Sequence, residues 1–191
     1  GEDYLKHLDQ DVIFRTPGLH PRFLESARQQ GSVVTSEMEV FFQLCPCPVI
    51  AVTGSDGKTT TTTMIAELLK ATGKHVHLGG NIGRPLLTEV DSIHPEDVAV
   101  VELSSFQLMD MDQSPHIAVL TNLSPNHLDV HSSYEEYLQA KANIFRFQKS
   151  SDRAVFNLDN EITRMLSKEA SSKRIYFTRF EEPENGAFLR G

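Results

Sequence analysis

The 191-residue sequence predicts an α/β fold built on a doubly wound, mostly parallel sheet. Strand-like segments alternate with helical ones from Val49 onward. Two strand segments, VAVVEL (98–103) and IAVL (117–120), are apolar without the alternation of a half-exposed strand. Such runs are typical of central parallel strands that helices cover on both faces. A glycine turn that joins the first strand to its helix favours the same class.

The elements of this region follow from apolar spacing and from turn residues. We expect strands at Val49–Thr53, His75–Leu78, Val98–Leu103, Ile117–Thr121, Ala154–Asn157 and Arg174–Phe177. We expect helices at Thr59–Ala71, Gly83–Val90, Tyr134–Gln148 and Asn160–Lys168. The tail at 181–191 is expected to complete no further element.

The residues before Val49 resemble the end of a separate α/β unit whose first half is absent. The expected order is a strand at Asp11–Arg15, a turn at Thr16-Pro17-Gly18, a helical segment at Pro21–Gln30 and a strand at Ser32–Thr35. A connecting helix is expected at Ser36–Leu44. We therefore divide the chain into the C-terminal part of a Rossmann-like domain (1–36) and a central domain (37–191).

Composition excludes some classes of function. A net charge of −8 argues against broad electrostatic binding to nucleic acid. No apolar run approaches the ~20 residues of a membrane span, so we expect a cytoplasmic protein without membrane insertion. Cys45 and Cys47 lack further thiols or histidines at ligand spacing, so we interpret them as ordinary reduced residues.

The stretch VIAVTGSDGKTTTTT (49–63) predicts a phosphate-binding loop between a strand and a helix. Glycines let backbone N–H groups approach phosphate oxygens, and the helix start offers unpaired donors. Lys58 adds a charge for the outer phosphates, and the Thr59 hydroxyl suits magnesium. The residues expected to bind nucleotide are Gly54, Ser55, Asp56, Gly57, Lys58, Thr59 and Thr60. The spacing is shortened, because Val52 stands where the common motif has its first glycine; the alternative is an ordinary glycine turn before a helix.

Polar residues follow two other strands of the predicted sheet, where ligands of open parallel sheets bind. Asn81 lies in the loop GGNIG (79–83), for which a plain turn is the alternative interpretation. Glu102 ends the apolar strand VAVVEL, and a carboxylate there needs a partner. It is a candidate magnesium ligand, with a structural salt bridge as the alternative.

A third group follows the strand at 117–121. His127 and His131 are candidates there, although a surface histidine is the simpler interpretation of either, and we expect His131 to have no role. On the next helix, Lys141 shares a face with Tyr137, Ile144 and Phe145. Such a lysine commonly extends along the apolar surface to reach water. Here the face points toward the expected phosphate site, so Lys141 is also a candidate.

These segments together resemble the Mur ligase family, which builds the peptide stem of bacterial peptidoglycan. The matching pieces are TGSDGKTT, GGNIG, ELSSFQL, NHLD and Lys141, and ELSSFQL is similar to the branch that adds D-glutamate. The resemblance implies an ATP-dependent ligase that joins D-glutamate to UDP-N-acetylmuramoyl-L-alanine through an acyl phosphate. It implies ATP and two magnesium ions (Mg2+) as cofactors. It also implies small-molecule substrates, and we expect the protein to be monomeric.

The resemblance also implies roles for single residues. Lys58, Lys141 and His127 would be catalytic, and the magnesium ligands would be Thr59, Glu102, His127 and Lys141 carried as a carbamate. The substrate side would comprise Asn81, Ser104, His127, Thr16, Pro17 and Gly18. A carbamate would turn a cation into the oxygen ligand that magnesium prefers.

Two positions depart from the family pattern. Asn126 stands where members carry an acid, and Asp56 where they carry asparagine; Asp56 should weaken nucleotide binding unless its side chain turns outward. The family has a further D-glutamate-binding domain that is absent here, so we expect this polypeptide alone to be incomplete for catalysis. Three alternatives are a nucleotide-binding module without ligase activity, a related folylpolyglutamate-synthase-like ligase, and a small-molecule kinase.

Overall fold

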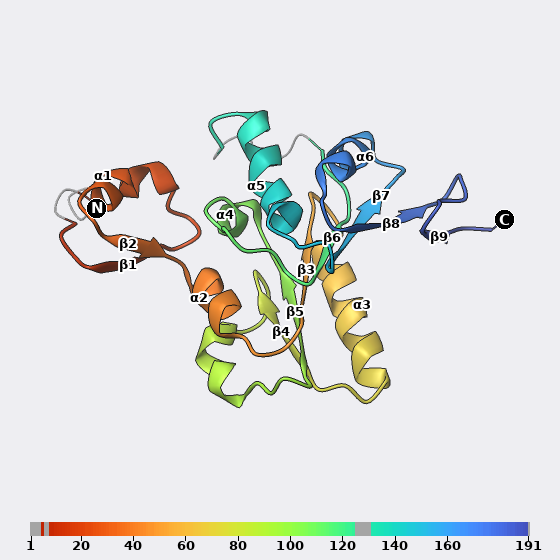
Figure 1. Ribbon diagram of the computed structural model, residues 1–191, viewed down its shortest axis with the longest axis horizontal. Coiled ribbons are helices and arrows are strands. Elements are labelled where there is room, and N and C mark those ends of the chain that lie inside the picture. The colour runs from red at the N-terminus through yellow and green to blue at the C-terminus, as the bar shows by residue number, and fades with distance from the viewer. Residues whose placement is uncertain (1–4, 6–7, 125–130, 191) are drawn as a thin grey trace.

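The computed structural model describes residues 5, 8–124 and 131–190 of the chain (Figure 1). Its large sheet has the order β4-β5-β3-β6-β7-β8-β9, and each neighbouring pair is parallel. These strands are β3 (Val49–Thr53), β4 (Val76–Gly80), β5 (Val98–Glu102), β6 (Ile117–Leu120), β7 (Arg153–Asn157), β8 (Lys173–Thr178) and β9 (Gly186–Phe188). The α-helices of this region are α2 (Glu37–Leu44), α3 (Lys58–Ala71), α4 (Ser105–Leu108), α5 (Tyr134–Arg146) and α6 (Glu161–Leu166), and the short 3-10 helices are η3 (Leu86–Ser92) and η4 (Ser167–Glu169).

Helices cover both faces of the sheet, which confirms the predicted doubly wound α/β class. Ala51 and Val101 face a core that contains residues of α2 and α5, whereas Ile50 and Val100 face α3. All five residues of β5 are buried. The central strands are therefore apolar on both sides, as their unbroken apolar runs predict.

A second, two-stranded sheet lies apart from the first in Figure 1, with α2 between them. It pairs β1 (Val12–Phe14) with β2 (Val33–Thr35) in parallel, and η2 (Pro21–Leu24) and α1 (Glu25–Gln29) lie between these strands in sequence. The guanidinium of Arg15 donates to the carbonyl of Phe106 at 3.0 Å and thereby ties this unit to α4. The domain boundary at residue 36 stays a prediction.

Two expectations about local structure are wrong. The helix expected at Gly83–Val90 is instead η3, which begins after Pro85, because the ring of proline disfavours helical backbone in the preceding residue. The tail also completes an element, since β9 adds to the edge of β8 through Tyr176 and Gly186. Gly186 lies so close to the Tyr176 carbonyl that a Cβ would meet that oxygen at 1.8 Å, so only glycine fits this pairing.

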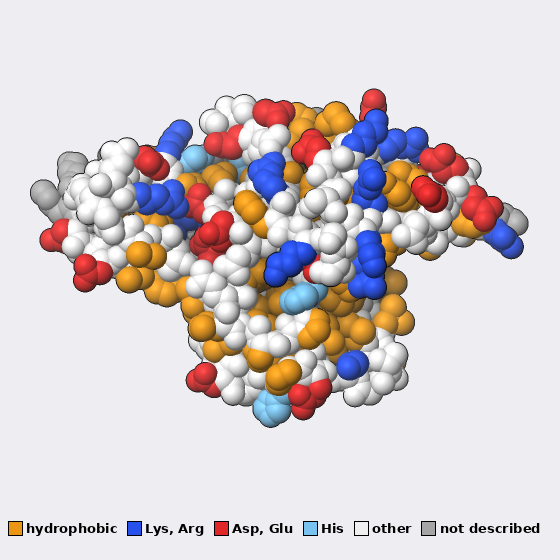
Figure 2. Space-filling model, viewed as in Figure 1, with side chains coloured by type: hydrophobic (Ala, Val, Ile, Leu, Met, Phe, Trp, Pro, Cys, Tyr) orange, Lys and Arg blue, Asp and Glu red, His pale blue; other side chains and the backbone are white. Residues whose placement is uncertain are grey.

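The surface divides by chemistry. Figure 2 shows charged side chains along the upper part of the face in view and hydrophobic ones gathered in the lower part. Among the residues that the structure describes, no helix combines the length and the apolar character needed to cross a membrane.

Candidate functional site

The loop after β3 has the backbone of an open anion-binding turn. Gly57 is the residue before α3 and has φ of 75°, in the left-handed region. No side chain caps the helix start, so its first N–H groups remain available to a ligand. Gly54 is required for a second reason: a Cβ there would meet Oγ1 of Thr121 at 1.9 Å.

Hydrogen bonds from the two residues that follow β6 hold this loop. The amide of Asp56 donates to Oδ1 of Asn122 at 3.0 Å, and Oγ1 of Thr121 donates to the Asp56 carbonyl at 2.7 Å. Only the backbone of Asp56 is engaged in these bonds, and the residue is exposed. Its departure from the family pattern therefore adds a charge at the surface of the loop. Lys58 donates to the carbonyl of Ser55 at 3.0 Å, so its ammonium folds back over the loop.

Glu102 and Thr59 meet at the carboxyl end of the sheet, as the strand order requires for β5 next to β3. The Thr59 hydroxyl donates to Oε2 of Glu102 at 2.7 Å, and the Asn81 amide donates to Oε1 at 2.7 Å. Adjacent ligands of an octahedral magnesium ion with bonds of 2.0–2.1 Å lie about 2.9 Å apart. The two oxygens therefore suit magnesium in type and in spacing.

Lys141 reaches the same region from α5. Its side chain is buried, with 2% of the residue exposed, and Nζ donates to Oγ1 of Thr53 at 3.1 Å. No carboxylate of a described residue lies within salt-bridge distance of Nζ. Burial, together with the nearby charge of Lys58, lowers the pKa of Lys141 from 10.5 to about 7, against the opposing effect of Glu102. A large share of this amine is therefore neutral at physiological pH.

Thr53 and Tyr137 are site residues whose importance was not apparent from sequence. The Thr53 hydroxyl donates to the Leu103 carbonyl at 2.7 Å while it accepts from Lys141, so it links β3, β5 and α5. The Tyr137 hydroxyl lies 2.8 Å from Oγ of Ser55. The one signal in the sequence was Thr53, a polar residue at the end of an apolar strand, and many strands end in this way.

The remaining predicted residues fall into three groups. Thr16, Pro17 and Gly18 are exposed, and Pro17 lines a cavity of about 280 Å³ together with Gly80 and Gly83, which flank Asn81. The Ser104 hydroxyl caps α4, where it accepts from the backbone N–H of Gln107. His127 and Asn126 lie outside the described residues.

His131 does not fit the expectation of a surface histidine. It is buried, its Nε2 lies 2.8 Å from Oγ of Ser105, and its ring stacks on Phe106 at 5.2 Å between centroids. His131 is buried because of tertiary packing: α4 follows β5 directly and packs against the residues that lead into α5. His131 thus helps to hold α4 against α5.

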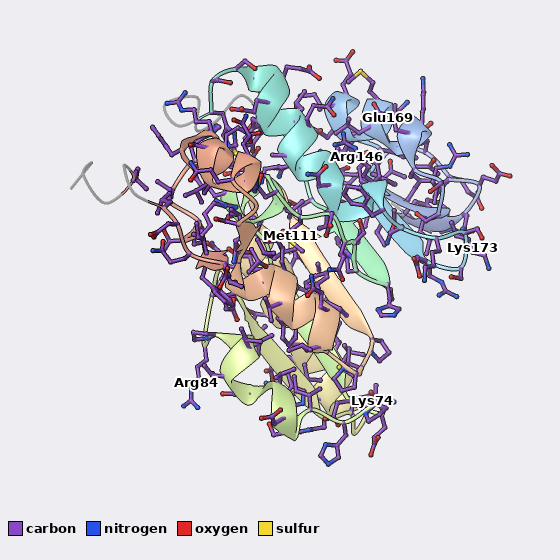
Figure 3. The ribbon with its side chains drawn as sticks, turned by 60° about the vertical axis from the view of Figure 1, so that its left-hand side comes forward. Lys74, Arg84, Met111, Arg146, Glu169 and Lys173 are labelled. Atoms are coloured by element: carbon purple, nitrogen blue, oxygen red, sulfur yellow. The ribbon has the colours of Figure 1, made fainter. Side chains whose placement is uncertain are left out.

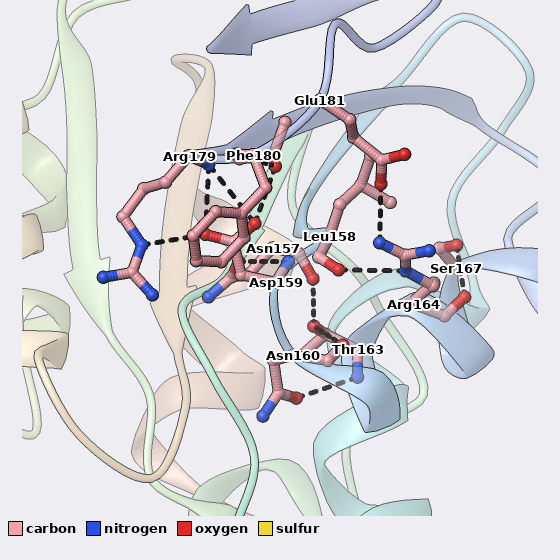
Figure 4. Close-up of polar contacts among 11 residues, drawn as sticks. Asn157, Leu158, Asp159, Asn160, Thr163, Arg164, Ser167, Arg179, Phe180 and Glu181 are labelled. Atoms are coloured by element: carbon pink, nitrogen blue, oxygen red, sulfur yellow. Dashed lines mark hydrogen bonds and ion pairs between the residues drawn. The ribbon is translucent and has the colours of Figure 1, made fainter. Parts of the chain in front are cut away.

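A cavity of about 530 Å³ lies beside the loop, at the carboxyl ends of β6, β7 and β8. Asn122, Phe177 and Phe188 contribute to its lining. Hydrogen bonds join three polar residues of the lining: Asp159 accepts from Oγ1 of Thr178 at 2.6 Å and from Nε of Arg179 at 3.0 Å (Figure 4). Sequence analysis did not identify this cavity, because its residues come from separate strands.

Comparisons with known proteins agree with this geometry. The family model described as the Mur ligase middle domain matches residues 52–189. UDP-N-acetylmuramoylalanine–D-glutamate ligase of Acetivibrio thermocellus is 55% identical over 100% of this chain, and its counterpart from Clostridium kluyveri is 50% identical over 99%. The chain spans 41% and 42% of the lengths of these relatives.

Solved structures agree as well. UDP-N-acetylmuramate-alanine ligase of Thermotoga maritima superposes with a TM-score of 0.57 at 25% identity, over 92% of this chain and 40% of that one. A UDP-N-acetylmuramoyl-L-alanyl-D-glutamate–2,6-diaminopimelate ligase gives a TM-score of 0.61 at 25% identity, over 90% and 46%.

Proposed function

This chain belongs to the Mur ligase family through its middle domain, and from that premise we propose that it is the ATP-binding part of a ligase that joins D-glutamate to UDP-N-acetylmuramoyl-L-alanine. Its relatives from A. thermocellus and C. kluyveri are named for this addition of D-glutamate. The observation that carries the proposal is the convergence of the loop, Glu102 and Lys141 at one end of the sheet.

The proposed reaction has two steps. The carboxylate of UDP-N-acetylmuramoyl-L-alanine attacks the γ-phosphorus of ATP, and the bond to the β-phosphate oxygen breaks to give an acyl phosphate and ADP. The amine of D-glutamate then attacks the acyl carbon. The tetrahedral intermediate expels phosphate, and loss of a proton from nitrogen leaves the amide. The same phosphoryl group thus turns a poor leaving oxygen into a good one.

The residues of the loop would hold the nucleotide. The N–H groups at the start of α3, from Gly57 to Thr60, would face the phosphates, and Lys58 would neutralise charge that develops on the transferred group. Thr59 and Glu102 would hold one magnesium ion, with Asn81 keeping the carboxylate in position. Magnesium supplies positive charge that screens the repulsion between the anionic nucleophile and the phosphates.

Lys141 would act as a carbamate. Its neutral amine takes up carbon dioxide and releases a proton, which creates a carboxylate at the end of a long side chain. That group would be an oxygen ligand for a second magnesium ion. The burial that lowers the pKa of Lys141 favours this reaction, because only the uncharged amine is nucleophilic. His127 remains a candidate for the same region.

The substrate and the nucleoside would lie on opposite sides of the loop. The cavity lined by Pro17 and Gly80, next to Asn81, would receive the muramoyl-alanine substrate, with Ser104 nearby. The cavity lined by Asn122, Phe177 and Phe188 would receive the adenosine of ATP, because it combines amide groups with aromatic surface.

A substitution at Phe188 tests the adenosine cavity. Phe188→Ala should weaken ATP binding about five-fold or more, from 1–3 kcal/mol per stacked base, and should leave binding of inorganic triphosphate unchanged. Phe180→Ala is the matched control, since Phe180 is exposed and does not line the cavity. Equal effects of Phe188→Ala on both ligands would contradict the assignment.

We propose that the enzyme acts in the cytoplasm and as a monomer. The ligation is tested with this chain extended to the length of its curated relatives, by following amide formation with several amino acids. Preference for an amino acid other than D-glutamate would overturn the proposal. Binding of ATP with magnesium by an extended chain that never forms the amide would favour a nucleotide-binding module.

A further inference from the structure

A second group of potential ligands lies at the amino end of the sheet, at the opposite end of the strands from the loop. His75 and His77 are two residues apart around the start of β4, so they lie on one side of the strand. Asp97 precedes β5, which pairs with β4 in the register Val76 to Val98. One residue earlier, this register brings His75 opposite Asp97. Figure 3 labels Lys74, the residue before His75, at the lower tip of the molecule.

The three side chains converge on one point. Oδ2 of Asp97 lies 2.9 Å from Nε2 of His77 and 3.2 Å from Nδ1 of His75. All three ligand atoms lie within 4.8 Å of one another. In a tetrahedral zinc site with bonds of 2.0–2.2 Å, ligand atoms are about 3.3 Å apart. The spacing of 3.2 Å between His75 and Asp97 already matches, and the spacing of 2.9 Å between His77 and Asp97 is about 0.4 Å shorter. His75, whose side chain is 71% exposed, is free to turn and shorten the third.

Burial holds the other two ligands in position. His77 and Asp97 are buried, and Asp97 also accepts from the backbone amide of His94 at 2.9 Å. The carboxylate oxygen Oδ2 of Asp97 is thus held by the His77 ring at 2.9 Å and by the His94 backbone. An anionic oxygen fixed between two imidazoles is a preorganised site for a cation.

We propose that His75, His77 and Asp97 bind a divalent transition-metal ion of the zinc class, with a fourth position open to water. Two imidazoles and one carboxylate are ligands that zinc accepts, whereas magnesium prefers an octahedral set of oxygens. The site is independent of the proposed ligase chemistry. It would join β4, the edge strand of the sheet, to β5 at their amino ends, and thereby stabilise the strand that carries Asn81 at its other end.

Calorimetric titration of the metal-free 191-residue chain with ZnCl₂, without a histidine tag, tests the proposal. One zinc ion should bind per chain, and excess MgCl₂ should not displace it. At a free zinc concentration one hundred times Kd, Tm should rise by about 5–10 °C. Co²⁺ should give the visible absorption of a tetrahedral nitrogen and oxygen site.

Variants then identify the ligands. His75→Ala removes an exposed side chain and should weaken zinc binding at least tenfold, the lower end of what even outer-shell changes cost a metal site (about 10- to 100-fold). Asp97→Asn should do the same, with circular dichroism to verify folding. His94→Ala is the matched control, since the contact of this exposed neighbour with Asp97 comes from its backbone. The absence of saturable binding, unchanged affinity in His75→Ala, or equal weakening by His94→Ala would each overturn the proposal.

Discussion

Replacement of Lys141 by methionine should make the protein more stable, and by an amount that depends on pH. Lys141 is buried, and its pKa falls from 10.5 to about 7 in the folded chain. At 1.36 kcal/mol per pKa unit, this difference corresponds to about 5 kcal/mol that folding loses when the amine is fully charged. Methionine has a similar length and carries no charge, so the loss disappears in Lys141→Met.

The sign of the pH dependence follows from linkage. Because the folded pKa is the lower one, the unfolded chain binds more protons between pH 7 and 10.5, and stability rises with pH there. The cost is present in full below pH 7 and shrinks above it. Between pH 6 and pH 9 the parent should gain about 2–3 kcal/mol relative to Lys141→Met. The contacts that methionine loses, including the bond to Thr53, contribute equally at each pH and cancel from this comparison.

Urea unfolding of both proteins at pH 6, 7.5 and 9 measures the effect, in buffers freed of carbon dioxide so that no carbamate forms. A relative change of this size moves the urea midpoint by about 1 M. Lys168→Met, at an exposed lysine, is the control and should show no such trend. Stability curves for the parent and Lys141→Met that stay parallel across this range would refute the reasoning, because the amine would then be as well solvated as in the unfolded chain.

Three further predictions concern the proposed ligase site. Lys141→Ala should lose amide formation in the extended chain and regain part of it with added short-chain carboxylates; activity equal to the parent without any additive would refute the carbamate. Glu102→Gln keeps the shape of the side chain but removes its charge. ATP affinity in magnesium should therefore fall at least about tenfold, the loss expected when a metal ligand is perturbed, while ATP affinity in EDTA stays the same. Calorimetric titration compares the two affinities, and an equal loss in both buffers would argue against a metal role. Gly54→Ala places a Cβ 1.9 Å from Oγ1 of Thr121 and should abolish ATP binding and lower Tm. Gly57→Ala has open space around its Cβ, so it should cost only the strain of a left-handed backbone, about 1–2 kcal/mol. Equal stability losses of the two variants in thermal unfolding would show that the contact at Gly54 is relieved.

The central part of the fold could be predicted from sequence because the information is local. The β-branched runs of β3, β5 and β6 are apolar on both sides, and the glycines of the loop precede a helix that has no side-chain cap. These features depend on steric preference and burial along one short segment. The helix predicted at 83–90 was wrong, and the strand at 186–188 was not predicted, for the complementary reason. Pro85 makes the helical segment start later, as η3, and β9 exists only because it pairs with β8 at Tyr176.

The identities of Lys58, Thr59, Glu102 and Lys141 as candidates came from the sequence, but their state did not. Only tertiary packing decided that Lys141 is buried, which lowers its pKa, and that Glu102 receives hydrogen bonds from both Thr59 and Asn81. The cavity beside the loop and the group of His75, His77 and Asp97 could not be predicted either, since neighbouring strands of a parallel sheet come from distant parts of the chain. A strand can be predicted from its own residues, whereas the charge and the solvation of a side chain depend on which neighbours the folded sheet brings to it.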